Sequence, residues 1–491
     1  MSSSRCALAQ MSARIRLAIF CLQGTIVFKT TVLSAALAAA LFHPLLPAAA
    51  ADDADLTAIR AQIGDMKASY EARLMALEQR LQDAQAAGAP ARTAAPAPAA
   101  AAPVPAALPA AAAAHSPSAS NAFNPNISLV LGGTYANLSQ DPQQYRLQGF
   151  MPSAGEAGPG RRGFNLGESE LTMAANIDPM FSGQLTFALS GEDTVGVEEA
   201  FVQTRALANG LNIKAGRFLS SVGYLNNRHA HTWDFVDAPL AYQAFLGGQY
   251  KPDGVQAKWL APIDTLVEIG VELGSGASFP GNDRNKNGFG AAALYAHVGD
   301  DIGASGSWRA GLSLLRTGAA NREFGDPSEH GGNLSAFSGR SRMLILDAIY
   351  KWAPNGNPAQ QNFKLQGEYL RRHESGELTS SVASGASAGS YDSTQSGWYL
   401  QGVYQFMPNW RAGLRYDKLA SNTPSIGLAD PFPLLAGYSP SRRSVMLDYS
   451  PSEFSRLRLQ FARDGSRPGA VDNQIFLQYI MSLGTHAAHA F

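Results

Sequence analysis

Residues 410–416 read Trp-Arg-Ala-Gly-Leu-Arg-Tyr, and residues 474–481 read Gln-Ile-Phe-Leu-Gln-Tyr-Ile-Met. In the first stretch, apolar residues at even positions alternate with Arg and Gly at odd positions. Successive side chains of a β-strand point to opposite faces, so a two-residue period predicts a strand with one apolar and one polar face. The same period recurs at 363–369 and 456–461. These stretches predict an all-β architecture.

Segments of this kind follow one another from about residue 126 to the last residue, Phe491. We count about sixteen of them and expect each to form one antiparallel strand. Their centres lie near residues 132, 170, 186, 200, 214, 257, 270, 294, 311, 347, 367, 402, 415, 446, 461 and 478.

The connections between segments decide which β architecture they build. Tight turns follow five even-numbered segments, and loops of roughly twenty to thirty residues follow segments 1, 5, 9, 11 and 13. Short turns on one rim and long loops on the other are typical of an outer-membrane β-barrel, in which apolar faces meet lipid and polar faces line the lumen. The expected turns are Asp178-Pro179, Asn209-Gly210, Pro262-Ile263, Pro408-Asn409 and Pro451-Ser452.

Residues 1–51 have the composition of an export signal. Basic residues precede an apolar stretch from about Thr31 to Leu46, and small residues follow up to Ala51. We expect cleavage near Ala51, so that the barrel (residues 122–491) lies in a bacterial outer membrane; a retained membrane anchor is the alternative. Both cysteines, Cys6 and Cys21, fall in this leader, so the mature chain would have no thiol for disulfide or metal chemistry.

Two further regions precede the predicted barrel. Residues 52–85 place apolar side chains at spacings of three and four, starting Leu56, Ile59, Ile63, which predicts a coiled-coil helix in the periplasm. A lone amphipathic helix is the alternative. Residues 86–121 are almost entirely Ala and Pro and cannot build a core, so we expect an extended linker there.

Charge limits the possible partners. The net charge is −1, so nucleic acid is not expected. Residues 122–491 contain 29 Lys and Arg against 32 Asp and Glu, which speaks against a strongly anion-selective channel. Several charged side chains fall on the polar faces of predicted strands and are candidates for the pore lining. They are Lys214, Arg309, Lys364, Glu368, Arg411, Arg415, Arg456 and Arg458.

The layout resembles the sixteen-stranded outer-membrane porins, and within them the phosphate-selective porin-like group with an N-terminal coiled coil. The resemblance rests on the coiled-coil spacing, the strand count, Lys214-Ala-Gly-Arg217-Phe218 followed by Gly223, and the terminal Phe491. It implies a homotrimer embedded in outer-membrane lipid. It also implies that Phe491 is a signal to the barrel assembly machinery.

The resemblance further implies that the third outer loop, about Leu219 to Tyr250, folds inward and narrows the pore. Six side chains of this loop are candidates for the constriction, although they would equally serve to pin the loop to the wall. They are Arg228, His229, His231, Trp233, Asp234 and Asp237. His229 and His231 are also candidate metal ligands, with Asp234 or Asp237 completing the set.

The expected function is passive diffusion of small polar or ionic solutes through a water-filled pore. We find no arrangement of Ser, His and Asp in the predicted strands that suits a lipase or protease, so neither an enzyme nor a cofactor is expected. Two alternatives remain. One is a structural protein that reaches the cell wall or a periplasmic partner through the coiled coil, and the other is a metal-related uptake channel.

Overall fold

The computed structural model describes residues 125–484, apart from 154–156, 190–193, 206, 283–284, 326–333, 383–384 and 429–431. The predicted signal, coiled coil and linker and the terminal Phe491 lie outside the described residues. Among the described residues, no helix is long and apolar enough to cross a bilayer.

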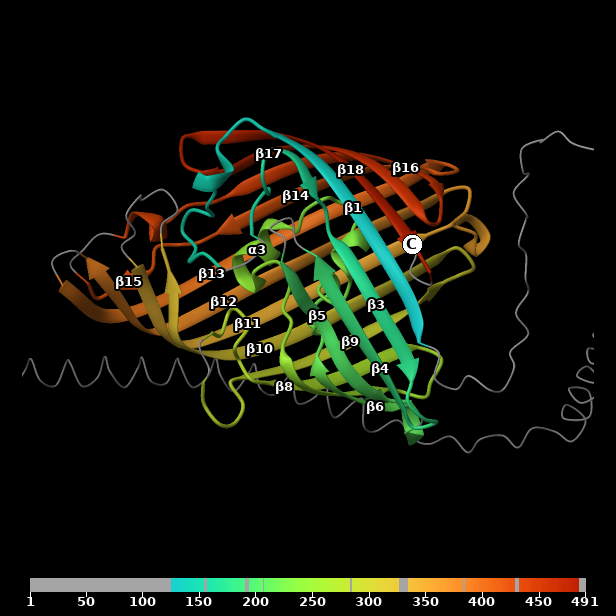
Figure 1. Cartoon of the computed structure of the whole chain (residues 1–491), viewed down its shortest axis with the longest axis horizontal. Coiled ribbons are helices and arrows are strands. Elements are labelled where there is room, and N and C mark those ends of the chain that lie inside the picture. The colour runs from blue at the N-terminus through green and yellow to red at the C-terminus, as the bar shows by residue number, and fades with distance from the viewer. Residues whose placement is uncertain are drawn as a thin grey trace, which may run out of the picture. The chain divides into compact units, whose positions relative to one another are not determined.

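The strands form one antiparallel sheet that closes on itself (Figure 1). β1 (Asn126–Leu138) pairs with β18 (Ala470–Leu483) on one side and with β3 (Ser169–Asn176) on the other. β2 (Gly163–Leu166) also pairs with β1, farther along β1 than β3 does, so β2 and β3 occupy the same strand position in the wall. β15 (Ser425–Ile426) pairs with an outer part of β13. The wall of the barrel therefore has 16 strands, and every predicted strand centre falls in one of them.

The other wall strands follow in chain order around the barrel. They are β4 (Phe181–Leu189), β5 (Val195–Thr204), β6 (Leu211–Arg217), β7 (Asp253–Leu260), β8 (Leu266–Gly274), β9 (Ala291–Ile302), β10 (Gly306–Phe324), β11 (Leu334–Trp352), β12 (Asn362–Val382), β13 (Gly385–Met407), β14 (Trp410–Ala420), β16 (Ser441–Ser452) and β17 (Ser455–Arg467).

Tight turns follow all five of the predicted strands at the same end of the barrel, and the last of them lies at Glu453-Phe454, two residues after the predicted Pro451-Ser452. Asn209 and Asn409 adopt left-handed backbone angles there, with φ of 59° and 70°, which asparagine tolerates better than most residues. At the opposite end, the predicted long loops after β1, β6 and β14 are also present. Loop length is therefore segregated between the two rims, as in outer-membrane barrels.

Two of the predicted outer loops are wrong. Most residues of the loops predicted after segments 9 and 11 lie in strands instead, because β10 to β13 continue to lengths of 19 to 23 residues. Polar side chains with a two-residue period form strands as readily above the membrane as within it. The sequence Gly385-Ala-Ser387-Ala-Gly389 has the spacing of a nucleophile elbow, but it lies in β13 and not at the strand-to-helix turn that an elbow needs.

The outer surface of the barrel carries an apolar band. Large side chains such as Leu346, Leu414 and Leu459 are 44%, 64% and 50% exposed, although burial of such groups drives folding in water. Aromatic side chains border the band toward the short turns, where the Trp410 and Tyr449 rings lie 4.8 Å apart. Toward the long loops, Trp398 and Tyr416 lie 5.4 Å apart. Two aromatic girdles around an apolar band mark the two interfaces of a membrane.

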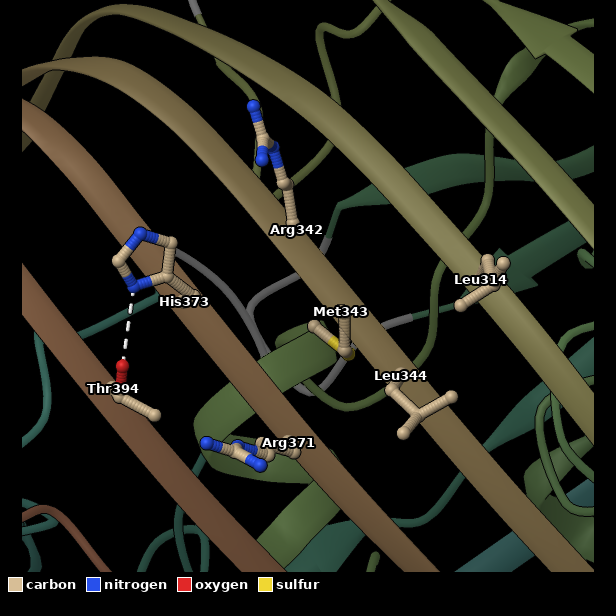
Figure 2. A pocket seen from close by; sticks show the side chains of 7 residues that line it. All are labelled: Leu314, Arg342, Met343, Leu344, Arg371, His373 and Thr394. Carbon is tan, nitrogen blue, oxygen red and sulfur yellow. Dashed lines mark hydrogen bonds between the residues drawn. The ribbon is translucent and has the colours of Figure 1, made fainter. Parts of the chain in front are cut away.

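Beyond the second girdle, the outward side chains become basic. Figure 2 shows the change on β10 to β13, where Leu314 and Leu344 lie beside Arg342, Arg371 and His373. Arg342 pairs in register with Arg316 on one side and with His373 on the other. His373 also hydrogen-bonds to Thr394 across β12 and β13. Because charged side chains are costly in lipid, this row marks where the membrane ends on the outer side.

Candidate functional site: the loop inside the barrel

The third outer loop is the segment 218–252 between β6 and β7. It contains the short helices η3 (Ala230–Thr232) and α3 (Leu240–Leu246), and every residue of α3 is buried. α3 contacts β12, β13 and β14, which lie across the barrel from β6 (Figure 1). A loop that leaves the wall at β6 and is buried against β12 to β14 must enter the barrel.

The loop has an apolar core of its own inside the barrel. Trp233, Leu240, Tyr242 and Phe245 pack together with wall side chains such as Leu370, all at most 7% exposed. Phe150 of the first outer loop packs edge-on against Phe245, with ring centroids 5.5 Å apart. Burial of this apolar surface offsets the cost of ordering a long loop, so its position is fixed.

Glu368 on β12 holds the first turn of the loop. Its carboxylate accepts hydrogen bonds from the backbone N–H groups of Tyr224 and Leu225 and from the Tyr242 and Tyr399 hydroxyls, at 2.7 to 3.2 Å. Gly223 is required beside it. Its φ is +71°, and a Cβ atom there would lie 2.3 Å from a Glu368 carboxylate oxygen.

Asp234 and Asp237 anchor the middle of the loop to the basic wall. Asp234 lies 2.7 Å from the Lys364 ammonium and 3.4 Å from the Arg411 guanidinium. Asp237 lies 2.7 Å from Arg415 and 2.5 Å from the guanidinium of Arg442. Burial alone would raise the pKa of Asp237, but the two arginines outweigh it and lower the pKa to about 2. The anchor is therefore charged at every physiological pH.

Two more wall arginines bind the loop backbone. Arg458 donates to the Trp233 carbonyl at 2.6 Å, and Arg456 donates to the His231 carbonyl. The indole N–H of Trp233 in turn donates to the Arg228 carbonyl at 2.9 Å. Charge-assisted hydrogen bonds of this kind are among the strongest available to a protein. Arg456 and Arg458 are at most 1% exposed, so they hold the loop and do not meet bulk water.

His229 and His231 lie on the opposite, acidic wall. The Nδ1 atom of His229 is 2.9 Å from Glu170 and 3.3 Å from Glu198, and its Nε2 atom is 3.2 Å from Glu199. His231 Nδ1 is 3.0 Å from Glu170. Burial disfavours a charged ring, but the surrounding carboxylates outweigh it and raise the pKa of His229 well above its ordinary value. The predicted metal partners Asp234 and Asp237 are wrong, because both pair with the basic wall.

An irregularity of β5 explains why two glutamates meet His229. Thr186 on β4 pairs with Glu199, but Phe187 pairs with Val197, so Glu198 is an extra residue in β5. This β-bulge breaks the alternation, and Glu198 and Glu199 are both buried inside the barrel. A strict two-residue period assigns one of them to the lipid face, which is why sequence reasoning missed the pair.

The inner wall therefore divides by charge. Carboxylates dominate on β3 to β8, where Glu170, Glu198, Glu199, Glu268 and Glu272 face inward with Lys214 and Lys258 among them. Cations dominate on β10 to β17. The inward cations there include Arg309, Arg322, Lys351, Lys364, Arg372, Arg411, Arg415, Arg442, Arg456 and Arg458, and they outnumber the inward carboxylates Asp347, Glu368, Glu374, Asp417, Asp448 and Asp464 of the same strands.

Only some of the inward cations keep contact with solvent. Arg228 is exposed, and Lys214, Arg309 and Lys351 are half-buried. Arg309 donates to the Gly223 carbonyl at 2.9 Å and lies over the Tyr224 ring, as Arg228 does from the loop. Lys351 was not among the predicted lining residues. It lies on the inward face of β11, so the two-residue period of that strand could have identified it. The predicted lining residues Lys364, Glu368, Arg411 and Arg415 are instead buried beneath the loop.

No protein-family model matches the chain. It is 30% identical over 413 residues to a protein of Aquifex aeolicus (strain VF5) named "Uncharacterized protein", a match that covers 77% of this chain and 82% of the other. The chain belongs to the family of that Aquifex protein.

Several solved outer-membrane proteins are similar in shape. OmpT of Vibrio cholerae is 12% identical, with a TM-score of 0.45, and the match covers 74% of this chain and 98% of OmpT. The anion-selective porin of Comamonas acidovorans is 12% identical with a TM-score of 0.44, covering 73% and 99%. The outer-membrane channel DcaP of Acinetobacter baumannii is 12% identical with a TM-score of 0.43, covering 73% and 97%.

Proposed function

We propose that this chain is an outer-membrane porin through which small polar or ionic solutes diffuse passively, with the third outer loop as its constriction. The observation that carries the proposal is the loop's position inside the barrel. On one side Glu368 of the wall binds the loop backbone and Asp237 of the loop pairs with the basic wall, and on the other side His229 of the loop pairs with the acidic wall. A loop that is attached to both walls narrows the lumen and keeps a fixed position, so it does not move to block the pore. Conduction then depends on the side chains that still meet solvent.

The division of charge supports a general porin over a strictly anion-selective one. Most carboxylates of β3 to β8 and most cations of β10 to β17 are buried, but they lie on opposite walls, and we infer that they set up a transverse field across the passage. Both signs of ion find a favourable wall. We infer weak selectivity and no tight solute site, since a conducting pore must release what it binds.

Conductance of the purified, folded protein in a planar bilayer tests the proposal. We expect ohmic single-channel steps and a small reversal potential in a salt gradient. The protein counts as folded if its mobility on gels changes after heating. A folded barrel that gives no conductance steps would contradict the proposed channel function, and would favour a structural role for the N-terminal region.

We also propose that residues 52–85 form a periplasmic coiled coil that holds three copies together, and that Phe491 serves as the assembly signal. The heptad-like spacing of Leu56, Ile59 and Ile63 supports the coiled coil. We expect the full chain to sediment as a trimer in detergent, and the chain lacking residues 52–85 to dissociate into single barrels on dilution. A trimer of unchanged stability after the deletion would show that the barrel walls suffice.

A further inference from the structure

We propose that Glu170, His229 and His231, with Glu198, bind one divalent transition-metal ion of the zinc class between the third outer loop and the barrel wall. Glu170 and Glu198 come from β3 and β5, and the two histidines come from the loop. One donor atom from each of Glu170, His229 and His231 lies within 4.8 Å of the other two. The inference does not depend on conduction, because it concerns binding to the folded barrel.

The spacing of the donor atoms fits such an ion. Zn²⁺ binds imidazole nitrogen and carboxylate oxygen at about 2.0–2.2 Å in a tetrahedral arrangement, which sets neighbouring ligand atoms about 3.4 Å apart. His229 Nδ1 lies 2.9 Å from Oε2 of Glu170 and 3.3 Å from Oε2 of Glu198, and His231 Nδ1 lies 3.0 Å from the other oxygen of Glu170, Oε1. An ion requires these spacings to open by up to about half an ångström and the remaining spacings, which are at most 4.8 Å among Glu170, His229 and His231, to close around it, together with loss of the ring protons.

Two irregularities of the wall gather the carboxylates at this place. The break between β2 and β3 leaves Glu168 beside Glu170, and one oxygen each from Glu168, Glu170 and Glu198 also lie within 4.8 Å of one another. The bulge in β5 turns both Glu198 and Glu199 inward. β-Bulges recur next to functional sites because they re-aim side chains, and here two departures from regular pairing serve one cluster.

The charge of the cluster favours a cation. Glu170, Glu198 and Glu199 are at most 5% exposed, and Glu168 is half-buried next to them. The groups that can carry positive charge beside them include His229, His231 and Lys251, which lies 3.3 Å from Glu198, with Lys214 near Glu199. Buried charges need opposite charges or metal ions nearby, and a divalent ion supplies two positive charges at the centre of the group.

The donor set selects the class of ion. Two imidazoles and carboxylates are typical of zinc, cobalt, nickel and copper sites, whereas magnesium and calcium prefer oxygen ligands alone. His229 keeps 13% of its side chain exposed, beside the exposed Arg228, so an ion entering the lumen reaches the site without unfolding the loop.

Titration of Zn²⁺ into the purified full-length barrel tests the proposal, with free Zn²⁺ set by a chromophoric chelator. The His486→Ala/His489→Ala background removes a separate His-x-x-His pair that would compete for metal. In this background we expect one equivalent bound, and a loss of at least about 100-fold in affinity in the added His229→Ala/His231→Ala variant. The added His297→Ala variant is the matched control, since His297 pairs with Glu268 elsewhere on the wall.

Two results would overturn the site: no stoichiometric Zn²⁺ in the background protein, or equal affinity after both loop histidines are replaced. If the double variant fails to fold, the absorption spectrum of Co²⁺ bound to the background protein tests the proposed ligands without that variant. A tetrahedral nitrogen and oxygen site produces intense visible absorption that Zn²⁺ displaces, whereas weak octahedral absorption would contradict the proposed ligands.

Discussion

The Glu368→Ala variant is expected to conduct at least about twice the current of the unaltered protein in single-channel records, because it releases the first turn of the third outer loop. Removal of the carboxylate leaves two backbone N–H groups and two tyrosine hydroxyls without their acceptor. Each buried polar group left unsatisfied costs about 1–3 kcal/mol, so the loop's present position loses several kcal/mol. The loop should also become sensitive to protease added from the outer side.

Asp472→Ala is the control for this variant. Asp472 is an equally buried inward carboxylate, but it accepts hydrogen bonds from Ser139 and Gln140 and so holds the first outer loop. We expect its loss to destabilise the barrel without the gain in current. Unchanged conductance in Glu368→Ala, with the barrel folded, would mean that the third outer loop does not set the width of the pore.

Reversing the charge of one cation of the third outer loop and one of the basic wall, both in contact with solvent, is expected to change ion preference. In the Arg228→Glu/Lys351→Glu variant, two cations beside the passage become anions. One unit charge at about 4 Å in water contributes about 1 kcal/mol, which corresponds to roughly a fivefold change in relative ion occupancy. We therefore expect the cation-to-anion permeability ratio, measured as a reversal potential in a salt gradient, to rise on the order of fivefold or more.

The Arg316→Glu/Arg342→Glu variant changes the same number of charges on the outer face of β10 and β11. It should leave the reversal potential unchanged, because these side chains point away from the lumen. High salt should weaken the effect of the inner variant, since the Debye length falls to about 3 Å at 1 M. An equal shift from inner and outer variants would contradict the assignment of Arg228 and Lys351 to the passage.

The sequence predicted the wall well because alternation and turn chemistry are local. Asn209-Gly210 and Pro408-Asn409 define their turns with residues suited to left-handed or fixed backbone angles, and the strand between two such turns has little freedom in register. The errors arose where polar segments were interpreted as loops. β12 and β13 carry polar residues on both faces beyond the membrane, and composition alone does not separate an exposed hairpin from a loop.

The inner contacts were only partly predictable for a different reason. Inward charges can be assigned by parity, and that identified Lys364, Glu368 and Arg411. Their partners depend on how a loop of more than thirty residues crosses the barrel, which no local pattern encodes. The bulge at Glu198 is a change of one residue in pairing, yet it decides that Glu199 and Glu198 both meet His229. The mistaken pairing of His229 and His231 with Asp234 follows from judging proximity along the chain.

The path of the third outer loop also orders the events of folding. Both ends of the loop are attached to β6 and β7, but the side chains that shape it belong mainly to β12, β14, β16 and β17, which are more than a hundred residues later in the chain. Contacts of such sequence separation carry a large loop-closure cost, so we expect them to form late. The narrow part of the lumen thus requires contacts between the third outer loop and strands from the second half of the chain. An incomplete barrel lacks the side chains that hold the loop in place.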